Sequence, residues 1–128
     1  MPEELSPETP QFNIDLSYLR DVSSGSNEFM IEMIDLFLDQ TPGYFDNLDQ
    51  FINEENWAKV AEIAHKIKPT LAFMGADAAK DSMANIETSA RNLTDLETVS
   101  PAFSVLKGFS KDLFIKLKEV KEELEKEG

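Results

Sequence analysis

The stretch from residue 57 to residue 75, WAKVAEIAHKIKPTLAFMG, decides the fold because its bulky apolar residues recur at helical spacing. At about 100° per residue these side chains gather on one face, as in an amphipathic helix that buries a single stripe. His65 points to the opposite face, where its helical neighbours Ala61, Pro69 and Ala72 are small or compact. The stretch predicts a helix over residues 56–74 that ends at Gly75 and exposes a histidine. Its core stripe is Val60, Ile63, Ile67, Leu71 and Met74.

Similar apolar stripes precede and follow this segment, and no alternating strand pattern separates them. They predict a short helix over 15–20 and longer helices over 27–52, over 77–93 and from Ser100 and Pro101 onward. Helices of this length joined by short connections pack side by side. The sequence therefore predicts an all-α protein, an antiparallel four-helix bundle with an additional short N-terminal helix lying across it.

The expected long helices carry a capping residue, a proline and further core residues. Ser26 is expected to cap the helix over 27–52, and Pro42 either kinks that helix or divides it in two. Its expected core residues are Met30, Ile34, Phe37, Thr41, Tyr44, Leu48 and Ile52. Those of the following helices are Ala79, Met83, Ile86, Ala90, Leu93, Phe103, Leu106, Leu113, Leu117, Val120 and Leu124.

Length and charge limit the class of protein. A chain of 128 residues fits one domain, and residues 1–12, which are acidic and contain prolines, predict a flexible tail before a domain over 13–128. The net charge of −13 repels nucleic acid and anionic lipid. The chain has neither a signal peptide nor an apolar run of roughly 18 residues. We expect a cytoplasmic protein without disulfides, because it has no cysteine.

His65 is the candidate reactive residue of the sequence. An imidazole is a competent nucleophile near neutral pH, and one ring nitrogen can react while a partner holds the other. Lys68, one turn further along, would add positive charge beside an attached phosphate. A lone exposed histidine is more often an ordinary surface residue. It also cannot form a transition-metal site without a second histidine or a cysteine, so no metal is expected.

Residues 64–76, AHKIKPTLAFMGA, resemble the signature of histidine phosphotransfer (HPt) domains. The matching positions are His65, Ile67, Lys68, Thr70 and Gly75. The resemblance extends upstream to residues 37–42 and downstream to residues 86–91, so that it covers nearly the whole chain after the tail.

The resemblance implies a phosphorelay intermediate in two-component signalling. His65 would be phosphorylated by a receiver-domain aspartate and would pass the phosphoryl group to another receiver, with Lys68 as the cation near the phosphate. Gly75 would end the helix and allow close packing. The implied partners are response-regulator receiver domains and a hybrid sensor histidine kinase, with the protein itself a monomer. It would carry phosphate without independent turnover and without a cofactor of its own, because Mg²⁺ belongs to the receiver.

Two features depart from the pattern of the family. Pro69 stands where glycine or serine is most common, which keeps the imidazole accessible but removes a backbone donor. Glu87 and Arg91 fall where the family often places polar side chains near the histidine. They also satisfy the spacing of an ordinary i,i+4 surface ion pair, worth a few tenths of a kcal/mol.

A docking surface needs apolar side chains beside the histidine. We nominate Phe29, Met33 and Leu36 from the helix over 27–52, and Phe73 from the histidine helix, although all four could instead be buried against neighbouring helices. Ala61 and Ala72 would form the floor of the site.

Two alternatives to phosphotransfer remain at this stage. The first is an interaction module that binds receiver or kinase domains without being phosphorylated. The second is an enzyme that uses carboxylates in the bundle core, because Glu62 precedes His65 by three residues. This spacing occurs once, and both residues are expected to face outward.

Overall fold

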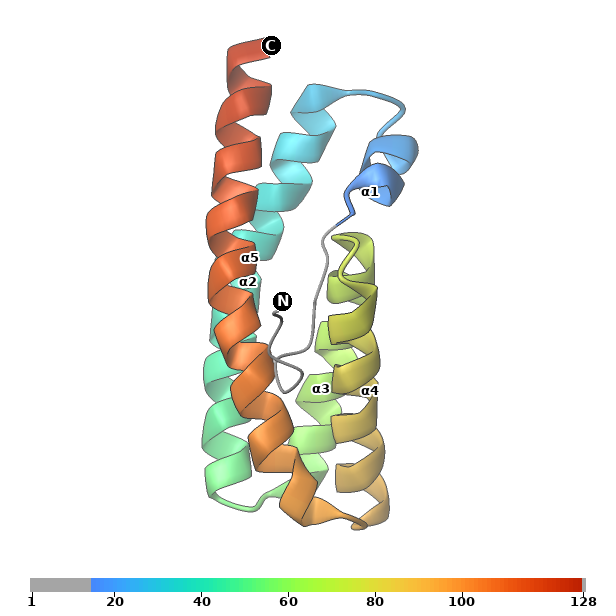
Figure 1. Ribbon diagram of the computed structural model, residues 1–128, viewed down its shortest axis with the longest axis vertical. Helices are drawn as coiled ribbons and strands as arrows, with labels where there is room; N and C mark the ends of the chain where they lie inside the picture. Colours follow the sequence, from blue (N-terminus) through green and yellow to red (C-terminus); the bar gives the residue numbers. More distant parts are fainter. Residues whose placement is uncertain (1–14, 128) are drawn as a thin grey trace, which may run out of the picture.

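The computed structural model describes residues 15–127 and shows an all-α bundle (Figure 1). Four long helices run antiparallel in chain order, and the short α1 lies at one end of the bundle. The elements are α1 (Ser17–Val22), α2 (Asn27–Asn53), α3 (Trp57–Phe73), α4 (Asp77–Asn92), the 3₁₀ turn η1 (Leu96–Thr98) and α5 (Val99–Glu127). This confirms the predicted fold class, while the tail predicted for residues 1–12 lies outside the described residues.

Each long helix packs against two others, so α2, α3, α4 and α5 enclose one core. The stripe predicted on α3 is buried throughout, and His65 lies on the opposite, exposed face. Within residues 15–127 no helix has the length and apolar character needed to cross a membrane.

Helix α2 is continuous through Pro42, so of the two outcomes expected there, a kink or a division, the division does not occur. Its start is as predicted, because the Ser26 side chain accepts a hydrogen bond of 3.2 Å from the backbone N–H of Phe29. Tyr44 is only half-buried, and Phe45 takes the core position instead. The ring of Phe45 stacks on that of Phe103, with 5.8 Å between centroids.

The ends of α4 and α5 also differ from prediction. Helix α4 ends at Asn92, and Leu93 adopts a left-handed conformation that leaves it 63% exposed, so its predicted core role was wrong. Helix α5 begins at Val99 rather than at the predicted Ser100–Pro101 start. Pro101 still falls in the first turn, where a missing N–H costs no helical hydrogen bond. Val120 is only partly buried.

Gly75 joins α3 to α4 in a conformation that favours glycine, with φ of 74°. Its carbonyl accepts a hydrogen bond of 3.1 Å from the N–H of Asp15, and its Cα approaches the Asp15 backbone so closely that a Cβ would overlap it. The predicted close packing at Gly75 is therefore a contact with the chain entering α1.

We expect Gly75→Ala to lower the free energy of unfolding by about 3 kcal/mol, from left-handed strain together with the clash at Asp15. Gly108→Ala is the matched control, because Gly108 lies within α5 with open space around its Cα. That change should raise stability by roughly 0.5–1 kcal/mol, the ordinary helical gain of alanine over glycine. Urea unfolding followed by circular dichroism measures both. Equal effects of the two substitutions would contradict the role given to Gly75.

Candidate functional site

His65 lies on the outer face of α3, with its side chain 66% exposed. The helix places it there because Val60, Ile63 and Ile67 occupy the buried face. Pro69 follows one turn later inside the same helix, and α3 remains continuous through it. Because Pro69 has no N–H, the carbonyl of His65 has no i+4 helical donor.

Glu87, on α4, carries the buried carboxylate of the site. The residue is 3% exposed and faces three basic side chains. Its Oε2 lies 3.0 Å from His65 Nδ1 and 2.8 Å from Arg91 Nη1. Its Oε1 lies 2.6 Å from Lys68 Nζ, in an ion pair. One carboxylate thus joins two residues of α3 to α4.

The basic partners keep this carboxylate ionised. Burial by itself raises the pKa of Glu87, because it removes water from the charged form. Lys68, Arg91 and the hydrogen bond to His65 together outweigh burial, so that the pKa of Glu87 lies below its ordinary value. The group is therefore a carboxylate near neutral pH.

The ionised carboxylate also determines which imidazole nitrogen carries hydrogen. Glu87 Oε2 can only accept, so the hydrogen of a neutral His65 ring must be on Nδ1. The lone pair is then on Nε2, at the other edge of a ring that is mostly exposed. This arrangement orients the imidazole and leaves one nitrogen available as a nucleophile.

An open hollow of about 520 Å³ lies beside His65, between α3 and α4. Small side chains line it, among them Ala61, which is buried, and Ala90. Arg91 lines it as well, whereas Lys68 does not. Ala72 and Gly75 line a different hollow, together with Tyr18 and Asp77 near α1.

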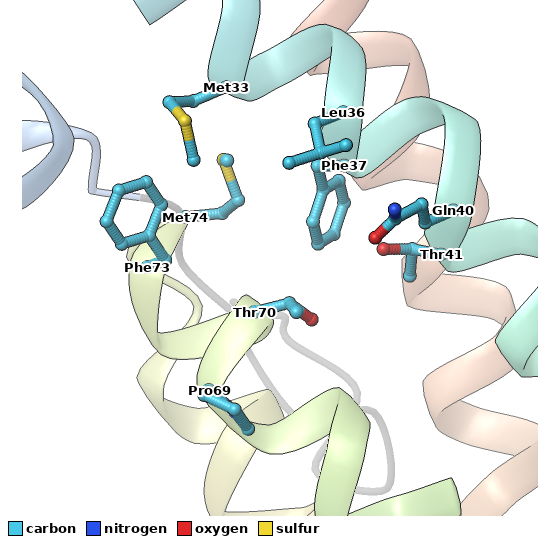
Figure 2. Close-up of a pocket in the computed structure, with 9 residues that line it drawn as sticks. All are labelled: Met33, Leu36, Phe37, Gln40, Thr41, Pro69, Thr70, Phe73 and Met74. Carbon is cyan, nitrogen blue, oxygen red and sulfur yellow. The ribbon is translucent and has the colours of Figure 1, made fainter.

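A third hollow, of about 190 Å³, lies between α2 and α3 and is lined almost entirely by apolar atoms. Figure 2 shows Met33, Leu36 and Phe37 projecting from α2 towards Pro69 and Phe73 on α3. Three of the four nominated docking residues line it, namely Met33, Leu36 and Phe73. Phe29 is 37% exposed and is not among the lining residues.

The structure thus gathers His65, Lys68, Glu87 and Arg91 at one place. Helical spacing alone indicated an exposed Glu87–Arg91 pair, and that pair exists at 2.8 Å. Spacing did not indicate that Glu87 itself would be buried. The available signal was its place one residue after Ile86 and three before Ala90, beside the buried stripe of α4.

Comparison with known families identifies the fold. The sequence model of the Hpt domain family matches residues 32–126, most of the chain, and the protein therefore belongs to this family. The family carries histidine phosphotransfer in phosphorelay signalling, as a phosphocarrier that interacts with receiver domains and kinases. Neither the curated proteins nor the solved structures gave a match.

Within residues 15–127, no group of three or more histidine, cysteine, aspartate or glutamate side chains is arranged to hold a metal ion. The basic residues that surround Glu87 already neutralise its charge.

We expect Glu87→Gln to lower the free energy of unfolding by about 2 kcal/mol above roughly pH 6, because an amide cannot replace the charge that binds three basic groups. The pKa of Glu87 is lower in the folded protein than its ordinary value of 4.5. Its stabilisation is therefore complete above that value and is lost as pH falls through the lower folded pKa.

The difference between wild type and Glu87→Gln should accordingly shrink below about pH 4. Urea unfolding at a series of pH values measures it, with Glu119→Gln, which removes the same charge from an exposed position on α5, as the control. A difference that stays constant across the series would show that the charge of Glu87 does not stabilise the fold.

Proposed function

We propose that His65 accepts a phosphoryl group from the aspartyl phosphate of one receiver domain and passes it to the aspartate of another. The observation that carries this proposal is the 3.0 Å contact of His65 Nδ1 with the buried carboxylate of Glu87. It holds the ring in the tautomer whose exposed nitrogen is nucleophilic.

In the transfer step, one bond to phosphorus forms and another breaks. The lone pair of Nε2 attacks the phosphorus in line, the N–P bond forms, and the P–O bond to the receiver aspartate breaks. The aspartate leaves as a carboxylate. The ring keeps its hydrogen on Nδ1 and gains a positive charge, which the Glu87 carboxylate balances. The reverse steps deliver the phosphoryl group to the next receiver.

In this proposal the metal ion belongs to the partner. The receiver supplies Mg²⁺, which neutralises charge on the phosphoryl oxygens in the transition state. The protein supplies the nucleophile, the Glu87 carboxylate that orients it, and the positive charge of Lys68 nearby. It acts as a carrier without turnover of its own, as a cytoplasmic monomer that serves a hybrid sensor histidine kinase and its receivers.

The apolar hollow between α2 and α3 supports a docking surface next to the histidine. Pro69 lies at its edge and is one helical turn from His65, so a receiver seated there has its active site close to the imidazole. Leu36 is 47% exposed at this surface. Docking therefore buries apolar area that the free protein leaves in water.

An interaction module without phosphorylation is the second candidate. It would use the same surface, but it gives no reason for a buried carboxylate to orient an exposed imidazole. The two candidates differ in one measurable outcome, the labelling of His65.

We expect a phosphorylated receiver domain to label the wild-type protein and not His65→Gln. The label should be lost in acid and kept in base, as a phosphoramidate bond requires. Glutamine retains an amide donor for Glu87, and a circular dichroism melt of each protein checks that the fold is intact. Binding of the receiver without any label on wild type would favour the interaction module.

We expect Leu36→Ala to slow transfer from the receiver by roughly tenfold, since truncating an apolar anchor typically costs 1 kcal/mol or more of binding free energy. Ile115→Ala is the matched control, because Ile115 is 57% exposed on α5 and does not line the hollow. The measurement is the transfer rate at receiver concentrations below saturation. Equal rates for the two variants would place the docking surface elsewhere.

A further inference from the structure

Arg91 and His65 share one partner, the carboxylate of Glu87. The Arg91 Nη1 and the His65 Nδ1 contact the same oxygen of Glu87, at 2.8 Å and 3.0 Å. Both side chains also line the open hollow between α3 and α4. Arginine has five N–H donors, and the contact to Glu87 uses the end nitrogen of only one arm. The remaining donors are available to a group attached to the imidazole.

Lys68 is placed differently. Its ammonium lies 2.6 Å from the other oxygen of Glu87, its side chain is 28% exposed, and it does not line the hollow. The side chain of Arg91 is 58% exposed, so it can move at lower cost. Lys68 is therefore the fixed counter-ion of the carboxylate, and Arg91 is the mobile one.

The charge at the site also favours a change of partner on phosphorylation. With a neutral imidazole, Lys68 and Arg91 supply one positive charge more than Glu87 balances. Glu62 and Lys66, which also line the hollow, carry opposite charges that cancel each other. A phosphoryl dianion on Nε2, together with the positive ring that results, adds a net negative charge and cancels this excess. Glu87 then still has Lys68 and the charged ring as partners. Arg91 can leave it without exposing a buried, unpaired carboxylate.

The geometry points to Arg91 as the residue that binds the phosphoryl group on His65, by moving from Glu87 to the phosphoryl oxygens while Lys68 stays on Glu87. This inference rests on the proposed function. It assigns the direct phosphate contact to Arg91, through the paired hydrogen bonds that guanidinium forms with phosphate. Lys68 acts on the phosphate only through its charge and through Glu87.

The test uses phosphoramidate as a small phosphoryl donor, so that no receiver is needed. Nε2 of His65 attacks its phosphorus, the N–P bond to His65 forms, the P–N bond of the donor breaks, and ammonia leaves. Phosphorus NMR then follows the phosphohistidine signal against pH. A bound guanidinium favours the dianion, so the titration midpoint of the phosphoryl group should lie about half a unit or more higher in Arg91→Gln than in wild type.

Matched variants separate direct binding from general charge. Arg20→Gln removes the same charge from an exposed position on α1 and should leave the midpoint unchanged. Lys68→Gln should raise it by less than Arg91→Gln does, and Arg91→Lys should restore it in part. A midpoint unaffected by Arg91→Gln, or more affected by Lys68→Gln, would overturn the inference. If wild type forms no phosphohistidine with phosphoramidate or with a phosphorylated receiver, the proposed function itself fails, which is a separate result.

Discussion

The buried carboxylate of Glu87 is the interaction on which the rest of the site depends. A carboxylate that is 3% exposed is costly to bury, and it is tolerated only with charged or hydrogen-bonding partners close by. Those partners are His65 and Lys68 on α3 and Arg91 on α4. The requirement to neutralise one charge therefore fixes the rotation of α3 against α4 and holds the imidazole in place, while the ring itself stays in water.

The fold could be predicted because apolar residues recur at helical spacing in every long helix. Each long helix carries four or more buried apolar residues at helical spacing, so that single errors do not change the architecture. The errors occur where spacing is ambiguous or where the helix ends. Tyr44 and Phe45 are three and four residues after Thr41 and fit the same face. The ring contacts of Phe45 with Phe103 and Phe114 on α5 decide between them. Leu93 fits the α4 stripe, but the helical geometry that would bury it stops at Asn92.

The site was predictable only in part, for a different reason. The exposure of His65 follows from one helix alone, because the apolar residues of α3 leave it no other face. The role of Glu87 depends on how α3 and α4 pack, and a single helix contains no information on the opposing side chains. In sequence, the spacing of Glu87 and Arg91 is that of any surface pair. Burial distinguishes this pair, because Lys68 and the imidazole of His65, both from α3, contact the same carboxylate.

The hollow beside His65 and the apolar hollow lined by Pro69 and Phe73 lie on different sides of α3. A carrier must bind two receivers in turn while holding the same phosphoryl group. The apolar hollow faces α2, and the hollow that contains Arg91 faces α4. Under the proposed function, a receiver that docks on the α2 side can therefore dissociate while Arg91, on the α4 side, stays on the phosphoryl group. Docking affinity and stability of the phosphorylated state then depend on different residues, so either can change without the other.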